Sequence, residues 1–251
     1  MIDPLFCPVG KSAAIEYAAK FLTQRGIHIT TTPSLDVTHL LLPVPSLDEN
    51  GHIKGGISPE QVLSQVSKDT VIFGGNLQHE VFSGRKCVDF LQDHHYLANN
   101  AAITAHCAFH RLGSALPVTL SECPVLIIGW GRIGKCLAAL LKAVGARVTV
   151  AARKESDRAT LESLGYATAD ASHWDTLDTC RAIVNTAPAP ILTDTSACRD
   201  DCVFLDLASK PGILADNVMW ERGLPNRDVP EASGNLIGET ALRLLRKQVK
   251  S

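Results

Sequence analysis

The stretch Pro124-Val-Leu-Ile-Ile-Gly-Trp-Gly-Arg-Ile-Gly-Lys-Cys-Leu-Ala-Ala-Leu-Leu-Lys-Ala-Val-Gly145 decides the fold of this chain. The apolar run 125–128 predicts a buried strand that ends in the glycine-rich turn Gly129-Trp-Gly-Arg-Ile-Gly134. A helix is predicted next, ending at Gly145, with an inward face made of Ile133, Cys136, Leu137, Leu140, Leu141 and Val144. A second β-rich run, 146–153, completes the first half of a dinucleotide-binding fold.

Each glycine of the turn meets one requirement of a diphosphate site. Gly129 permits the tight turn, Gly131 lets backbone amides approach the diphosphate, and Gly134 lets the helix pack close to the strand. The anion is expected at the helix N-terminus, where free N–H groups and the helix dipole favour negative charge. We therefore predict that the turn binds the cofactor through Gly129, Trp130, Gly131, Arg132, Ile133 and Gly134. A purely structural turn is the alternative.

The residues after the second strand bear on the choice of cofactor. NAD sites usually carry an Asp or Glu about 20 residues past the glycine motif. Here the strand ends in Ala152-Arg153-Lys154, with Glu155 and Asp157 beyond it. Guanidinium and ammonium groups suit the oxygens of a 2′-phosphate. We therefore predict NADP, bound in part by Ala152, Arg153 and Lys154, with NAD and two plain solvated loop charges as the alternative.

Composition narrows the classes of partner. The chain has 251 residues, 45% of them hydrophobic, and a net charge of −2, which is typical of a soluble globular protein of two domains without a bias toward nucleic acid. Aromatic residues make up only 5%, and no apolar run approaches the roughly 20 residues of a membrane span. The 8 cysteines form no CxxC pair. We expect a cytoplasmic protein with free thiols that binds neither nucleic acid nor membrane.

The first 99 residues predict a small parallel α/β lobe that binds substrate. Strands are expected at 27–31, 39–43 and 70–73, with a helix capped by Ser12 and another at 59–66. Residues 100–232 are assigned to a linking helix and a doubly wound Rossmann domain. The amphipathic tail 233–251 is expected to fold back on the first lobe, with Ile237, Ala241, Leu244 and Leu245 on its apolar face.

Two loops of the first lobe are candidates for substrate contact. Each follows an apolar strand, and ligands of open α/β sheets bind beyond the carboxyl ends of strands. We predict Ser46 from the first loop, and Gly75 and Asn76 from the second, as substrate-binding residues. Ordinary turns are the alternative, since Gly, Pro, Ser and Asn form turns.

The linking helix is predicted to begin at Asn99 and Asn100, because an Asn N-cap precedes a run of small residues. Asn100 and Thr104 are predicted substrate contacts. His106 is the predicted catalytic base, since an unperturbed imidazole titrates near neutrality. His106 and His110 stand one turn apart, as helical metal ligands can, but no third ligand follows at a recognisable spacing. We therefore predict no metal.

Two later strands feed polar loops at the same edge of the predicted sheet as the glycine turn. Ser209 and Lys210 form a hydroxyl and cation pair there, which we predict to hold a substrate carboxylate; a surface charge beside a Pro-Gly turn is the alternative. The nicotinamide end of the cofactor is expected at this edge. The predicted contacts are Thr186, Ala187, Pro188, Asp206 and Ala208.

The chain resembles the A subunit family of dipicolinate synthase over nearly its full length. The matching segments are Leu41-Leu-Pro-Val44, Asn100 with Thr104, the Gly129–Gly134 turn, the strand ending in Ala152-Arg153, Asn185-Thr186-Ala187-Pro188, Asp206-Leu-Ala-Ser-Lys-Pro-Gly212 and Gly223-Leu224-Pro225. The resemblance implies a flavodoxin-like lobe, a Rossmann lobe and an NADP-linked oxidation of a dihydrodipicolinate-type ring in sporulation. It also implies that the partner is a flavoprotein-like B subunit. We expect the substrate to lie in a cleft between the lobes and the protein to be a homo-oligomer.

Departures from the family pattern keep other functions open. This sequence has His106-Cys107 where the family has Glu-Gly, and Glu231 follows Pro230 where the family has Lys. The alternative that these changes motivate is a non-catalytic nucleotide-binding or regulatory subunit. A 2-hydroxy-acid dehydrogenase shares the plan of two lobes and is a further alternative, although we find no matching set of Arg, Glu and His in the second half.

Overall fold

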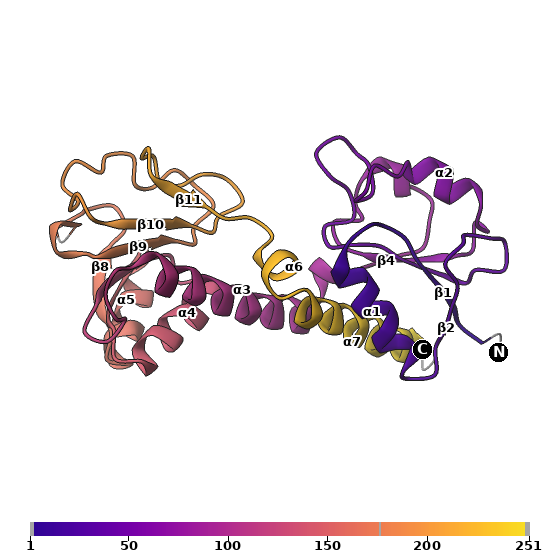
Figure 1. Cartoon of the computed structure of the whole chain (residues 1–251), viewed down its shortest axis with the longest axis horizontal. Helices are drawn as coiled ribbons and strands as arrows, with labels where there is room; N and C mark the ends of the chain where they lie inside the picture. The colour runs from indigo at the N-terminus through magenta and orange to yellow at the C-terminus, as the bar shows by residue number, and fades with distance from the viewer. Residues whose placement is uncertain (1–2, 176, 249–251) are drawn as a thin grey trace. The chain divides into compact units, whose positions relative to one another are not determined.

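The computed structural model describes residues 3–175 and 177–248, which form two compact units. The first unit comprises Met1–Asn100 and Pro225–Ser251, and the second comprises Ala101–Leu224. The chain therefore enters the second unit within one residue of the predicted boundary and leaves it before the predicted residue 232. Figure 1 shows the elements of both units along the chain.

The first unit is built on a parallel sheet of five strands. The strand order is β2-β1-β3-β4-β5, which is the flavodoxin-like order and confirms the predicted fold class. The strands are β1 (Leu5–Pro8), β2 (His28–Ile29), β3 (His39–Leu41), β4 (Val71–Gly74) and β5 (Cys87–Asp89). Their helices are α1 (Ala13–Thr23) and α2 (Pro59–Ser64), with the short 3₁₀ helices η1 (Glu80–Phe82) and η2 (Phe90–Gln92).

The end of the chain packs on the first helix of this unit, as Figure 1 shows. After α6 (Leu224–Asp228), α7 (Pro230–Gln248) lies against α1. A Cβ on Gly234 would lie 2.4 Å from the carbonyl oxygen of Ala14, and one on Gly238 would lie 2.7 Å from the Phe21 ring. The two glycines, one helical turn apart, therefore let the helix backbones approach closely. On the same helix Ile237, Ala241 and Leu245 are buried.

The linking helix α3 (His94–Ala115) begins five residues before the predicted start. Its first turn is capped by Asp93, whose Oδ1 accepts a hydrogen bond from the Tyr96 amide at 2.8 Å. Asn99 lies inside the helix, where its amide donates to the carbonyl of His95 at 2.9 Å. The predicted Asn cap is therefore wrong. Two histidines follow Asp93, so no apolar periodicity marks the true start.

Asp93 also pairs with α7, and this pair makes the stability of the first unit depend on pH. Two nitrogens of Arg243 donate to its carboxylate at 2.5 and 3.0 Å. These hydrogen bonds lower the pKa of Asp93, so their contribution is present above the unfolded pKa of about 4 and is lost as pH falls through the folded pKa. Asp93→Asn keeps a capping oxygen but removes the charge. We expect a loss of about 1–2 kcal/mol in the free energy of unfolding near neutral pH.

Thermal unfolding of both proteins between about pH 7 and pH 3 measures this effect. The difference in midpoint between wild type and Asp93→Asn is expected to shrink as the wild-type carboxylate becomes protonated. The matched variant Arg243→Gln is expected to show the same shrinking difference. A pH-independent difference would contradict the assignment of the stability to the ion pair.

The second unit is a parallel sheet of six strands in the order β11-β10-β9-β6-β7-β8. Numbered within the unit, this is the order 3-2-1-4-5-6 of a doubly wound dinucleotide-binding fold, which confirms the predicted Rossmann domain. The direction of winding reverses between β6 and β9. The elements are β6 (Pro124–Ile128), α4 (Arg132–Ala143), β7 (Arg147–Ala152), α5 (Glu155–Ser163), β8 (Ala167–Asp170), η3 (Leu177–Thr179), β9 (Ala182–Asn185), β10 (Val203–Asp206) and β11 (Val218–Trp220).

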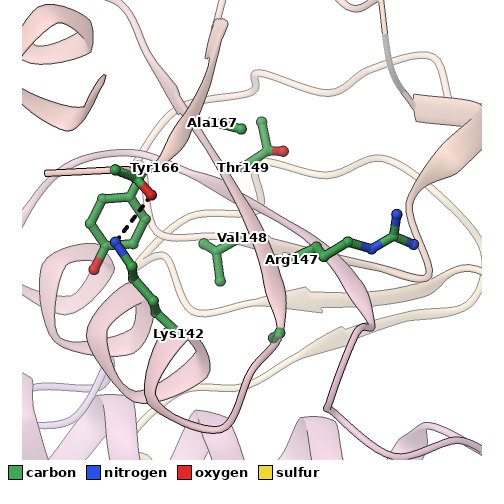
Figure 2. A pocket seen from close by; sticks show the side chains of 8 residues that line it. Lys142, Arg147, Val148, Thr149, Tyr166 and Ala167 are labelled. Atoms are coloured by element: carbon green, nitrogen blue, oxygen red, sulfur yellow. Dashed lines mark hydrogen bonds between the residues drawn. The ribbon is translucent and has the colours of Figure 1, made fainter. Parts of the chain in front are cut away.

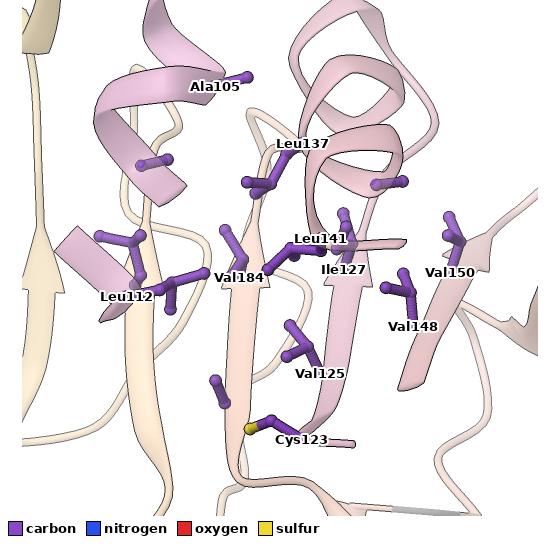
Figure 3. Close-up of a cluster of buried hydrophobic side chains, with 14 of the residues drawn as sticks. Ala105, Leu112, Cys123, Val125, Ile127, Leu137, Leu141, Val148, Val150 and Val184 are labelled. Atoms are coloured by element: carbon purple, nitrogen blue, oxygen red, sulfur yellow. The ribbon is translucent and has the colours of Figure 1, made fainter. Parts of the chain in front are cut away.

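The larger core of this unit lies between the sheet and the helices α3 and α4, as Figure 3 shows. Leu137 and Leu141 of α4 pack onto Val125 and Ile127 of β6, and all four side chains are buried. Val144 was predicted on the same face, but it lies just past the end of α4 and is 42% exposed.

The cysteines are free thiols, and burial raises the pKa of Cys180 to about 11. Across residues 3–175 and 177–248, no helix has the length and apolar character needed to cross a bilayer.

Candidate cofactor site

The carboxyl ends of β6 and β9 form the edge at which the winding reverses, and ligands of doubly wound sheets bind at such an edge. Thr186 joins the two strand ends, because its amide and its hydroxyl both donate to the carbonyl of Ile128 at 2.9 Å. The amide of Gly129 donates to the carbonyl of Ala151 at 2.9 Å, which ties the turn to β7. Hydrogen bonds therefore fix the glycine turn to the carboxyl ends of three adjacent strands, β9, β6 and β7.

The three glycines of the turn are needed for different reasons. Gly129 has a φ of +103°, which favours glycine. A Cβ on Gly134 would lie 2.2 Å from the carbonyl oxygen of Gly129, so only glycine allows this contact between helix and turn. Gly131 has a φ of −82°, and a Cβ added there would meet no atom within 4 Å. Nothing in the protein itself therefore requires glycine at 131, and the space beside it suits a bound group at the N-terminus of α4.

A cavity of about 380 Å³ lies beside the turn, within the size range of small-molecule sites. It brings together predicted cofactor residues from three segments of the chain, namely Gly129, Trp130, Ala152, Arg153, Lys154, Ala187 and Pro188. The Trp130 ring packs edge-on against Tyr166, with ring centroids 5.9 Å apart, which fixes one wall. Arg132 is exposed, whereas the side chain of Ile133 packs against the core, so only its backbone faces the turn.

Arg158, which was not predicted from the sequence, holds the backbone at the end of the cavity that carries Arg153 and Lys154. Its Nη1 donates to the carbonyls of Ala152 at 2.7 Å and Arg153 at 3.1 Å, and lies 3.2 Å from the carboxylate of Asp170. Hydrogen bonds from Ser172, more than the charge of Arg158, lower the pKa of Asp170. Arg158 therefore holds the backbone from which the exposed side chains of Arg153 and Lys154 extend.

Asp206, a predicted cofactor contact, is the last residue of β10 and does not line the cavity beside the glycine turn. Its side chain is fully buried, and its oxygens accept hydrogen bonds from Asn185 and from the amides of Ala208, Gly212 and Ile213. The carboxylate thus anchors its own loop, and the contact of Asp206 with the cofactor stays a prediction. Ala208 is buried too, and its carbonyl accepts a hydrogen bond from the Trp220 indole at 2.9 Å.

Ser209 and Lys210 are exposed on the loop that Asp206 anchors. They follow β10, and Thr186 to Pro188 follow β9, which is the neighbouring parallel strand. The predicted carboxylate-binding pair and the predicted nicotinamide contacts therefore belong to adjacent loops of one edge.

In the first unit, the two predicted substrate loops meet. The amide of Ser46 donates to the carbonyl of Gly75 at 2.8 Å, and the amide of Gly75 donates to the Ser46 hydroxyl at 3.1 Å. Ser46 is fully buried and its hydroxyl joins the two loops, so its contact with substrate stays a prediction. A Cβ on Gly75 would lie 2.5 Å from Val44, so this glycine serves packing. Asn76 is the exposed predicted residue, and its amide is held by Asp89 at 3.0 Å.

On α3, the predicted residues divide between two faces. Asn100 and Thr104 are one turn apart and half-buried, whereas His106 is exposed and rotated by about 200° from Thr104. His106 instead lies beside His110, with ring centroids 5.4 Å apart. The structure therefore does not bring the predicted base together with the predicted substrate contacts of its own helix. Among residues 3–175 and 177–248, no group of three or more His, Cys, Asp or Glu is arranged to hold a metal ion.

A second cavity of the same unit, of about 250 Å³, lies at the amino ends of β7 and β8 (Figure 2). Lys142 extends over the Tyr166 ring there, 4.4 Å from its centroid, and donates to the carbonyls of Leu164 at 2.7 Å and Gly165 at 3.0 Å. The ammonium thereby satisfies the C-terminal carbonyls that follow α5. None of the predicted site residues lines this cavity, and it lies at the opposite strand ends from the glycine turn.

Comparison with known proteins agrees with this geometry. Residues 92–199 match the family described as D-isomer specific 2-hydroxyacid dehydrogenase, NAD binding domain. That segment includes the glycine turn, Arg153 and Lys154, and the loop after β9.

Over most of its length, the chain is similar to the dipicolinate synthase A subunit of Bacillus subtilis (strain 168). The two are 25% identical over 243 residues, which covers 87% of this chain and 81% of the relative. The crystal structure of the same subunit from Bacillus subtilis matches with a TM-score of 0.84 and 20% identity, covering 100% of this chain and 99% of that chain.

The crystal structure of the dipicolinate synthase A subunit from Bacillus halodurans matches with a TM-score of 0.83 and 19% identity, covering 97% of this chain and 98% of that chain. The resemblance that the sequence motifs indicated is confirmed. The chain has the fold of the dipicolinate synthase A subunit, and its residues 92–199 are similar to the NAD binding domain of the D-isomer specific 2-hydroxyacid dehydrogenases.

Proposed function

We propose that this protein is an NADP-dependent oxidoreductase that oxidises a dihydrodipicolinate-type cyclic dicarboxylate. The glycine turn and the cavity beside it carry this proposal: a Cβ on Gly131 would meet no atom within 4 Å, and Arg153 and Lys154 line the neighbouring cavity. The similarity to the dipicolinate synthase A subunit supports the choice of substrate.

Different residues of the second unit bind the parts of the cofactor and of the substrate. Backbone amides at the N-terminus of α4 hold the diphosphate, and Arg153 and Lys154 hold the 2′-phosphate. Ser209 and Lys210 hold one carboxylate of the substrate. When bound, NADP⁺ would take up the hydride from the dihydro ring, and the ring would release one proton to solvent as it becomes aromatic; the protein contributes orientation and electrostatics.

Two measurements on the purified protein test the proposal. Fluorescence titration with NADPH and NADH is expected to show binding of both and tighter binding of NADPH. Incubation of dihydrodipicolinate with NADP⁺, with and without the B subunit of the relative, is expected to form NADPH and dipicolinate together. Absence of binding by both nucleotides would overturn the proposal of a redox enzyme.

Two other functions predict different results in the same experiments. The family match at 92–199 favours a 2-hydroxy-acid dehydrogenase, which would form NADH or NADPH from 2-hydroxy acids such as D-lactate. Against it, the histidine after β8, His173, pairs with Asp175 at 3.4 Å on an exposed loop, and Glu221 pairs with Arg111 at 3.8 Å. A non-catalytic subunit would bind nucleotide without hydride transfer to any of these substrates.

A further inference from the structure

A buried pair of side chains lies beneath the two loops at the cofactor edge of the second unit. Asn185 ends β9 and Asp206 ends β10, and the two residues are register partners in the parallel sheet. Both are 0% exposed. The Asn185 amide donates to Oδ1 of Asp206 at 2.9 Å, so the pair joins the two strand ends.

Asp206 holds the loop after β10 at three points. Its Oδ1 accepts a hydrogen bond from the amide of Ala208 at 3.0 Å, and its Oδ2 accepts from the amides of Gly212 at 2.6 Å and Ile213 at 3.0 Å. A carboxylate accepts hydrogen bonds and donates none, and a buried one is stable only while such donors remain in place. The closed path of residues 207–213 and the buried carboxylate therefore depend on each other.

Asn185 holds the neighbouring loop in the same way. Its Oδ1 accepts a hydrogen bond from the amide of Ala187 at 2.9 Å, and its Nδ2 donates to the carbonyl of Ala187 at 3.0 Å. The amides of Ile191 and Leu192 then donate to the carbonyl of Gly212 at 2.9 and 3.0 Å. The loop after β9 is thus joined to the loop after β10.

The fit between these loops leaves no room for a side chain at the point of contact. A Cβ on Gly212 would lie 2.2 Å from Nδ2 of Asn185 and 2.7 Å from the carbonyl oxygen of Ala189. Ser209 and Lys210 therefore extend from a loop whose two ends are fixed by the buried pair.

We propose that Asn185 and Asp206 are positioning residues that hold the loop after β9, where the nicotinamide end is expected, in register with the loop that presents Ser209 and Lys210. The inference rests on the proposed function and adds to it the pair that sets the distance between cofactor and substrate carboxylate. Small misplacement of reacting groups is costly, so such a pair belongs under a site where two ligands must meet.

Three variants test the pair. Asp206→Asn keeps the shape of the side chain but replaces one carboxylate oxygen with an NH₂ group. The backbone amides of the loop after β10 that donate to this oxygen then lose their acceptor. Asn185→Asp removes a donor and sets two carboxylates against each other. The double variant Asn185→Asp with Asp206→Asn restores a donor to the pair in the reverse direction. Asp216→Asn, on an exposed residue of the following loop, is the control.

Binding of two probes separates positioning from general damage. Adenosine 2′,5′-bisphosphate reports the adenine end of the site, and pyridine-2,6-dicarboxylate with NADP⁺ present reports the substrate end. We expect each single variant to weaken dicarboxylate binding at least tenfold, to change bisphosphate binding less than twofold, and the double variant to recover part of the loss. Equal loss of both probes, or unchanged dicarboxylate binding in Asp206→Asn, would overturn the inference.

Amide hydrogen exchange tests the pair without any ligand. Residues 207–213 are expected to exchange faster in Asp206→Asn than in wild type, while residues 129–134 exchange at the wild-type rate. Unchanged exchange at 207–213 would overturn the inference. A wild-type protein that binds neither probe overturns the proposed function instead, and exchange still decides the role of the pair.

Discussion

Replacement of Gly131 by alanine is expected to weaken NADPH binding by about tenfold to hundredfold without changing the unfolding temperature. The backbone at 131 is compatible with alanine, and no protein atom lies within 4 Å of the added carbon. The methyl group would occupy the space through which the diphosphate reaches the amides of α4. Loss of hydrogen bonds to a charged group accounts for the expected magnitude, since each contributes about 1.5–3 kcal/mol.

Gly134→Ala is the matched variant in the same turn, and it is expected to act in the opposite way. Its Cβ would lie 2.2 Å from a backbone oxygen, which cannot move aside cheaply. Overpacking of this kind costs about 1–3 kcal/mol, so the unfolding temperature should fall. Fluorescence titration and differential scanning calorimetry on both variants distinguish the two roles. Wild-type affinity in Gly131→Ala would show that the diphosphate does not approach this turn.

The double variant Arg153→Ser with Lys154→Ser is expected to reverse the preference for cofactor. NADPH should bind about a hundredfold more weakly, because the 2′-phosphate loses two charge-assisted partners. NADH lacks that phosphate and should bind as it does to wild type. Asp157 lines the same cavity and remains to accept a hydrogen bond from a ribose hydroxyl. Titration of wild type and variant with both nucleotides measures the change.

The control for this experiment is Arg199→Ser, which removes a cation paired with Asp201 before the start of β10, at the other end of the strands. It should leave both affinities unchanged. Equal weakening of NADPH and NADH in the double variant would mean that the two cations act on the diphosphate rather than on the 2′-phosphate. Tighter binding of NADH than NADPH by wild type would contradict the assignment of NADP directly.

The fold class could be predicted from the sequence because its strongest signal is local. The spacing of Gly129, Gly131 and Gly134 reflects a turn whose geometry involves a dozen consecutive residues, and the structure has strand, turn and helix at those positions. Two strands of the first unit, β1 and β5, escaped prediction, whereas β2 and β3, which are not longer, lie inside the predicted runs 27–31 and 39–43. The true start of α3 also escaped, because the cap at Asp93 is followed by polar histidines rather than an apolar periodicity.

The candidate site was predictable in its location but not in the direction of its side chains. Strand ends mark the sheet edges where Ser46 and Asp206 lie, but both side chains are buried. The amide that binds the Ser46 hydroxyl is 29 residues away in sequence, and the asparagine that binds Asp206 is 21 residues away. Hydrogen bonds over such separations depend on the register of neighbouring strands, which a single sequence does not display. Arg158 escaped for a different reason: its partners are backbone carbonyls only 6 and 5 residues earlier, and no side chain in the sequence marks them.

The packing of α7 on α1 also bears on the order in which the protein can fold during synthesis. Residues 101–224 emerge from the ribosome as one uninterrupted segment and contain every strand of their own sheet. The first unit, although its strands are translated earlier, lacks the helix that covers α1 until residues 230–248 have been made. Domains that fold as units during translation usually finish in the order of the chain. Here the segment translated in the middle can be complete first, and the last helix closes the unit that was begun first.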